Sequence, residues 1–105
     1  MPDDALAPEA LVHALLALPG WSGDQLAITK AWRFASFADA ITFMRLCIPG
    51  IETRSHHPEW TNVYDRVSAR LRTHDARDRV TAADLDLAAY LDAIAAQCGG
   101  VSAEP

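Results

Sequence analysis

Three of the four histidines in this chain stand close together in sequence, at His56, His57 and His74. Imidazole is the side chain whose ordinary pKa, about 6.5, allows it to give and take a proton near neutral pH. A cluster of three therefore indicates proton-transfer chemistry. Carboxylates and aromatic side chains accompany the cluster, namely Glu52, Trp60, Tyr64 and Asp84.

The same residues also have purely structural interpretations. Adjacent histidines such as His56 and His57 are common on loop surfaces, and Trp60 would ordinarily pack in a sheet. Asp84 is the third residue after Thr81, which is where a helix-capping carboxylate belongs. A metal site is not predicted, because adjacent side chains seldom converge on one ion and no cysteine or carboxylate stands at ligand spacing.

Apolar spacing and terminal signals predict three helices that would hold the cluster. The first begins near Pro8 and stops at Pro19-Gly20. The last begins at Thr81, where Asp84 completes a capping box, and Gly99-Gly100 ends it. Asp84 would therefore lie at the start of the last helix.

The middle helix has the clearest start and an irregular end. Ser36 and Asp39 have the form of a capping box, and a broad apolar stripe follows as far as residue 51. Proline removes a backbone hydrogen bond and glycine adds backbone freedom, so Pro49-Gly50 should kink or loosen the last turn. This irregularity would come directly before Glu52.

Four strands are predicted between these helices. Residues 25–35 alternate in polarity around an expected break near Thr29-Lys30, which indicates two short strands. Residues 60–64 and 67–73 form a second pair, with Val67, Ala69 and Leu71 facing inward. The same alternation places His74 at a strand end, on the open face.

This order of elements predicts an α+β fold, in which a single four-stranded antiparallel sheet carries three helices packed on one face. The order along the chain is α-β-β-α-β-β-α. We expect one domain over residues 1–105, with residues 1–7 and 101–105 frayed at the ends.

Composition narrows the class of protein. The formal net charge of −5 and the isoelectric point near 5.1 argue against direct nucleic-acid binding through a basic surface. A signal peptide and a run of about 20 apolar residues are not found, so we expect a cytoplasmic protein without membrane attachment. The two cysteines are interpreted as free thiols. A chain of 105 residues buries its surface incompletely, which favours a homodimer or homotetramer.

The spacing of these residues resembles a known family signature. Glu52, the His56-His57-Pro58 run, Tyr64, His74 and Asp84 follow one another as in the pterin-4a-carbinolamine dehydratases. Further similar positions lie around this motif and in the segments at Trp21, Trp32 and Ser36. The resemblance covers about residues 8–97.

The resemblance implies a lyase that acts in tetrahydropterin recycling. Members of the family dehydrate 4a-hydroxytetrahydrobiopterin, the carbinolamine left by aromatic amino-acid hydroxylases, to quinonoid dihydropterin and water, without metal or bound cofactor. By resemblance, His56, His57 and His74 are catalytic, with His56 leading at the 4a-hydroxyl. Which histidine is acid and which is base stays open. The resemblance assigns substrate binding to Glu52, Trp60 and Asp84.

A second function class uses the same scaffold. Relatives of this fold include non-catalytic binding or assembly proteins that dimerise a transcription factor or assist RuBisCO assembly. Retention of all three histidines favours the enzyme. The sequence differs from the usual family pattern at Ser55, at Pro49-Gly50 and in the charged segment 76–80, which borders the expected substrate site.

Overall fold

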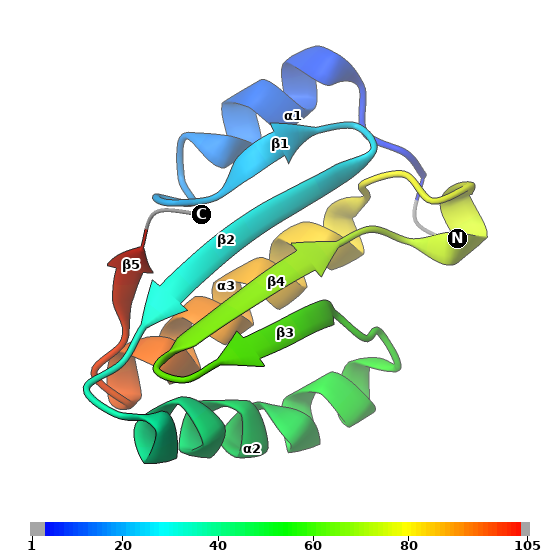
Figure 1. Cartoon of the computed structure of the whole chain (residues 1–105). Coiled ribbons are helices and arrows are strands. Elements are labelled where there is room, and N and C mark those ends of the chain that lie inside the picture. The colour runs from blue at the N-terminus through cyan, green and yellow to red at the C-terminus, as the bar shows by residue number, and fades with distance from the viewer. Residues whose placement is uncertain (1–3, 104–105) are drawn as a thin grey trace.

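The computed structural model describes residues 4–103 and has the predicted α+β class. Three α-helices lie with an antiparallel sheet and one short 3-10 helix, η1 (Figure 1). In chain order the elements are α1 (Pro8–Leu15), β1 (Ser22–Asp24), β2 (Ala27–Arg33), α2 (Phe37–Arg54), β3 (Glu59–Val63), β4 (Arg66–Leu71), η1 (His74–Ala76), α3 (Ala82–Gln97) and β5 (Val101–Ala103).

The sheet has five strands within the described residues, and the expected number of four is wrong by one. Its order is β1-β2-β4-β3, and β5 also pairs with β2. The additional strand is Val101–Ala103, which lies antiparallel to residues 31–33. The expectation that residues 101–105 fray is therefore wrong for this segment, because its backbone groups find partners on the edge of β2 beyond the end of β1.

The first hairpin lies earlier in the chain than predicted. Its turn is Gln25-Leu26, and Asp24 stabilises this turn by accepting a hydrogen bond from the Leu26 amide at 2.8 Å. β2 then runs without a break through Thr29-Lys30, so the predicted break there is wrong. Polarity alternation alone misplaced the turn, because Lys30 faces inward toward Asp92 instead of toward solvent.

The core lies between the sheet and the helices. Val67, Ala69 and Leu71 are buried on β4 as predicted, whereas Ser68 and Arg70 are exposed on the opposite face. In Figure 1, α3 passes behind β2 and β4, and the front of the sheet stays uncovered. The helices contribute buried apolar side chains that include Leu11, Phe43, Cys47, Leu87 and Leu91.

α2 continues past Pro49-Gly50 and ends at Arg54. The Ser36 hydroxyl accepts a hydrogen bond from the Asp39 amide at 3.1 Å, which confirms the predicted start. The residue that caps this end is Ser55, whose φ of 51° and ψ of 36° are left-handed. This residue turns the chain out of the helix and directs His56 toward α3.

The start of the chain is also tied to the domain. Residues 1–3 lie outside the described residues, but the Leu6 amide donates to the Val80 carbonyl at 3.0 Å and Gln25 donates to the Leu6 carbonyl. The expectation that residues 1–7 fray is therefore wrong at Leu6. Within residues 4–103, the helices are all too short or too polar to cross a membrane.

Candidate active site

The most buried part of the predicted site is a pair formed by His56 and Asp84. His56 Nε2 lies 2.6 Å from Asp84 Oδ1, and the two side chains are 15% and 0% exposed. A carboxylate in this position orients the imidazole and fixes which ring nitrogen carries the proton. Because Asp84 accepts at Nε2, the free ring nitrogen of His56 is Nδ1.

Asp84 is held in place by its other oxygen. Oδ2 accepts hydrogen bonds from the Thr73 hydroxyl and from the Thr81 amide, each at 2.9 Å. The Thr81 hydroxyl is 2.7 Å from that of Thr73 and also caps α3 by accepting from the Ala83 amide. Asp84 therefore closes the predicted capping box and binds His56 at the same time, so the two interpretations of this residue are compatible.

His57 and Glu52 form a second, looser pair. His57 Nε2 is 3.6 Å from Glu52 Oε1, and their side chains are 61% and 68% exposed. Glu52 comes from the last turn of α2, whereas His57 follows the turn at Ser55. Exposure leaves both side chains free to contact a ligand, and solvent weakens their mutual attraction.

His74 begins η1 and faces a carboxylate that the sequence motif does not contain. Its Nδ1 lies 2.6 Å from Asp78 Oδ1, and the side chains are 80% and 49% exposed. His74 directly follows Thr73, which is bonded to Asp84. His56 and His74 therefore adjoin one network where the end of α2, the end of β4 and the start of α3 meet at one end of the molecule (Figure 1).

Trp60 and Tyr64 lie apart from this network. Trp60 is half-buried and packs edge-on against Phe43, with ring centroids 6.5 Å apart. Tyr64 is exposed in the turn between β3 and β4, at the opposite end of β4 from Thr73. The structure therefore brings together His56 and Asp84, joins His57 to Glu52, and places the aromatic residues in the sheet and its turn.

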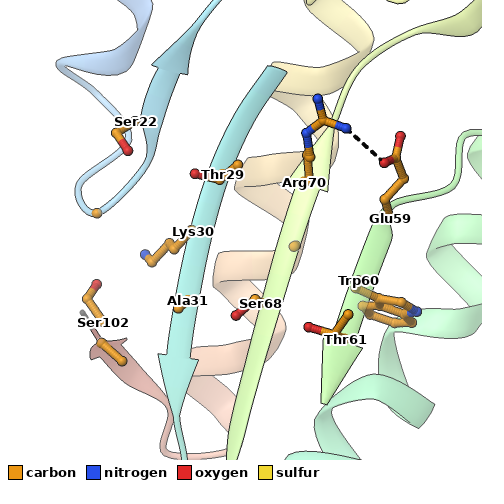
Figure 2. Close-up of a pocket in the computed structure, with 13 residues that line it drawn as sticks. Ser22, Thr29, Lys30, Ala31, Glu59, Trp60, Thr61, Ser68, Arg70 and Ser102 are labelled. Carbon is orange, nitrogen blue, oxygen red and sulfur yellow. Dashed lines mark hydrogen bonds and ion pairs between the residues drawn. The ribbon is translucent and has the colours of Figure 1, made fainter. Parts of the chain in front are cut away.

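A hollow of about 610 Å³ lies on the open face of the sheet and is separate from the histidines (Figure 2). Its floor contains small side chains that register places side by side across neighbouring strands, among them Ala31, Ser68 and Thr61. At one end, Glu59 accepts from Arg70 at 3.1 Å, as the dashed line in Figure 2 marks. Hydrogen bonds from Arg72 and Arg70 lower the pKa of the Glu59 carboxyl below its ordinary value.

Sequence reasoning missed Asp78. Its contact with His74 depends on the left-handed conformation of Arg77 and Asp78, which polarity patterns do not reveal. The motif also does not reveal that the Thr73 hydroxyl donates to Asp84 while it lies 2.7 Å from the Thr81 hydroxyl. Within residues 4–103, three or more His, Cys, Asp or Glu side chains do not come together in a way that could hold a metal ion.

The fold and this arrangement define a class of protein: an α+β domain in which three histidines each face a carboxylate and one of these carboxylates, Asp84, is buried. The family model described as pterin 4 alpha carbinolamine dehydratase matches residues 4–94. The chain belongs to this family, which confirms the resemblance found in the sequence.

Individual relatives agree with this assignment. A protein of Opitutus terrae is 48% identical over 73% of this chain and 79% of its own length. A protein of Nitrobacter winogradskyi is 44% identical over 93% of this chain and 98% of its own length. Both are provisionally named pterin-4-alpha-carbinolamine dehydratases.

A solved structure has the same fold. The crystal structure of a transcriptional coactivator/pterin dehydratase from Brucella melitensis superposes with a TM-score of 0.83 and 37% sequence identity. The alignment covers 88% of this chain and 99% of that one. The two functions in the name of that protein correspond to the two function classes considered for this scaffold.

Proposed function

We propose that this chain catalyses dehydration of 4a-hydroxytetrahydrobiopterin to quinonoid dihydropterin and water, in the recycling of tetrahydropterin. The observation that carries the proposal is the His56–Asp84 pair at 2.6 Å, with His57 and His74 exposed beside it. Family membership supplies the substrate class.

The reaction needs two proton transfers. The C4a–O bond breaks, and because hydroxide is a poor leaving group an acid must protonate this oxygen so that it departs as water. The N5–H proton passes to a base as the C4a=N5 bond forms. Atoms and charges then balance without an oxidant or reductant, and imidazoles can perform both transfers near neutral pH.

The geometry favours distinct roles for the site residues. His56 acts at the 4a-hydroxyl through Nδ1, since Asp84 occupies its other nitrogen. Asp84 has no exposed surface, so it acts by orienting His56 and not by touching the pterin. His57 and His74 assist at the open side of the site, and Glu52 is exposed enough to bind the amino-substituted edge of the pterin.

The assigned role of His56 has a direct test. Purified protein is mixed with freshly made 4a-hydroxytetrahydrobiopterin, and formation of the quinonoid product is followed by absorbance above the spontaneous rate. His56→Ala should reduce the enzymatic rate about a hundredfold, the usual contribution of a positioned acid or base. His13→Ala, on exposed α1 away from the motif, is the matched control and should leave the rate unchanged.

The same assay separates the two function classes. A folded wild-type protein that gives no acceleration would contradict the enzymatic proposal and favour a binding or assembly role on the same scaffold. An active wild type with an equally active His56→Ala variant would keep the dehydratase and overturn only the assignment of His56. Circular dichroism of each variant confirms that the fold is intact.

We further propose that the protein works as a homodimer or homotetramer in the cytoplasm. One side of α2 exposes Phe37, Ile41 and Ile48, which are 52%, 39% and 48% accessible. These positions lie within roughly 40° of one another around the helix axis, so they form one apolar stripe along α2. A stripe of this kind is typical of a self-association surface.

A further inference from the structure

The loop that follows β4 fixes both the backbone and the side chain of His74. The Thr73 amide donates to the Arg79 carbonyl at 2.9 Å, and this bridge closes the loop around η1. Thr73 is also fixed by its hydroxyl bond to Asp84. The backbone of His74 is therefore tied to the buried carboxylate network.

The far end of the same loop brings a carboxylate back to the His74 ring. Arg77 and Asp78 are consecutive residues with φ of 60° and 58°, a left-handed conformation that non-glycine residues seldom adopt. This reversal places Asp78 Oδ1 2.6 Å from His74 Nδ1. Strained backbone at a functional site is retained where it sets the geometry of a side chain.

We propose that Asp78 is a positioning residue for His74, an inference that rests on the proposed function of the site. The Asp78 carboxylate can only accept, so Nδ1 of neutral His74 carries the proton and donates it. Nε2 is then the unprotonated nitrogen, available to take a proton from the substrate. Asp78 thereby prepares His74 as a base.

The charged groups around this ring come from the loop and from the network behind it. Asp75, Arg77 and Arg79 belong to the same loop, and Asp84 lies behind Thr73. Asp78 is distinguished from the other carboxylates because it is the one in hydrogen-bond contact with His74. Asp75 therefore offers a matched control for loss of one negative charge from this loop.

The first test reads the His74 tautomer by nitrogen-15 NMR at pH 8.5, above the ordinary titration range of imidazole. The free neutral side chain prefers the proton on Nε2, so a proton on Nδ1 in the wild type would show the effect of Asp78. Asp78→Ala should return His74 to the Nε2–H form. Asp78→Glu should restore the Nδ1–H form at least in part, and Asp75→Asn should leave it unchanged.

The second test reads the reaction. Asp78→Ala should lower kcat about fivefold, less than the roughly hundredfold loss expected on removing an acid or base itself, with Asp78→Glu recovering part of the rate. A wild-type ring protonated on Nε2, or a tautomer and kcat that do not respond to Asp78→Ala, would overturn the proposal. The NMR measurement does not depend on catalysis. An inactive wild type in the dehydratase assay would therefore contradict the proposed function without changing the result on the His74 tautomer.

Discussion

Asp84 shows how one residue can cap a helix and hold a histidine at the same time. A carboxylate without exposed surface would be strongly destabilising if its oxygens lacked partners. Here His56, Thr73 and Thr81 supply them, and each comes from a different part of the chain. The buried network therefore orients the His56 ring without leaving the Asp84 oxygens unsatisfied, and the role proposed for Asp84 is compatible with its part in the fold.

The residue types of this site could be predicted from the sequence, but their partners could not. Motif spacing identified the histidines and Asp84, yet it could not show that Asp84 binds His56 across 28 positions of sequence. That contact depends on the left-handed turn at Ser55 and on the packing of α2 beside α3. Asp78 was missed for the same reason, because its contact depends on two left-handed residues that polarity patterns do not reveal.

Cys47 gives a prediction at the scale of a single group. Burial raises the pKa of its thiol to about 12, and neighbouring Cys98 adds to the rise. Since only the thiolate attacks a disulfide reagent, its reactive fraction at pH 8 is roughly a thousandfold smaller than for an ordinary cysteine. Cys47 in a Cys98→Ser variant should therefore resist dithionitrobenzoate in the native state and react rapidly in denaturant.

Cys98 provides the comparison for this experiment. It is partly exposed at the end of α3, and burial raises the pKa of its thiol as well. In the native wild type, mass spectrometry should find Cys98 modified first. Equal native rates at both positions would show that the α2 side of the core opens to solvent, contrary to the packing described.

At the scale of elements, the helices were predicted more accurately than the sheet. Capping residues are local signals, so Ser36 and Thr81 marked the starts of α2 and α3 correctly. β5 has only three residues and becomes a strand through pairing with β2, which local pattern cannot reveal. β2 was misread because Lys30 is a polar residue on the inward face, where it donates to Asp92 at 2.7 Å.

Pro49-Gly50 illustrates a sequence irregularity whose meaning depends on the neighbouring helix. A Cβ built at Gly50 would overlap the ring and the hydroxyl oxygen of Tyr90 on α3. The same ring stacks under the Arg54 guanidinium, 4.4 Å from its centroid. An alanine at this position would therefore displace the Tyr90 ring at the point where α2 lies beside α3, shortly before the turn at Ser55.

Gly50→Ala should therefore destabilise the protein although alanine is the better helix former. Overpacking typically costs about 1 to 3 kcal/mol and exceeds a propensity gain of at most about 1 kcal/mol. The free energy of unfolding in urea would measure the loss. In a Tyr90→Ala background the same substitution should be neutral or stabilising, and an equal loss in both backgrounds would show that contact with Tyr90 is not the cause.

At the scale of the whole molecule, the sheet and helices have complementary tasks. The helices bury one face of the sheet. The end of α2, the end of β4 and the start of α3 lie together near His56. The open face and the outer side of α2 are left for other contacts. Since the site lies at one end of the molecule, association through α2 would leave the histidines accessible.

The α2 stripe of Phe37, Ile41 and Ile48 makes self-association a prediction that can be measured. Light scattering after size exclusion should give the mass of a dimer or tetramer for the wild type. The double variant Ile41→Glu with Ile48→Glu should give a smaller species, because burying two carboxylates in an apolar contact is strongly unfavourable. Leu46→Glu is the matched control, since Leu46 is 41% exposed on the opposite side of the same helix. A wild type that is monomeric, or a double variant with the mass of the wild type, would exclude this stripe as the interface.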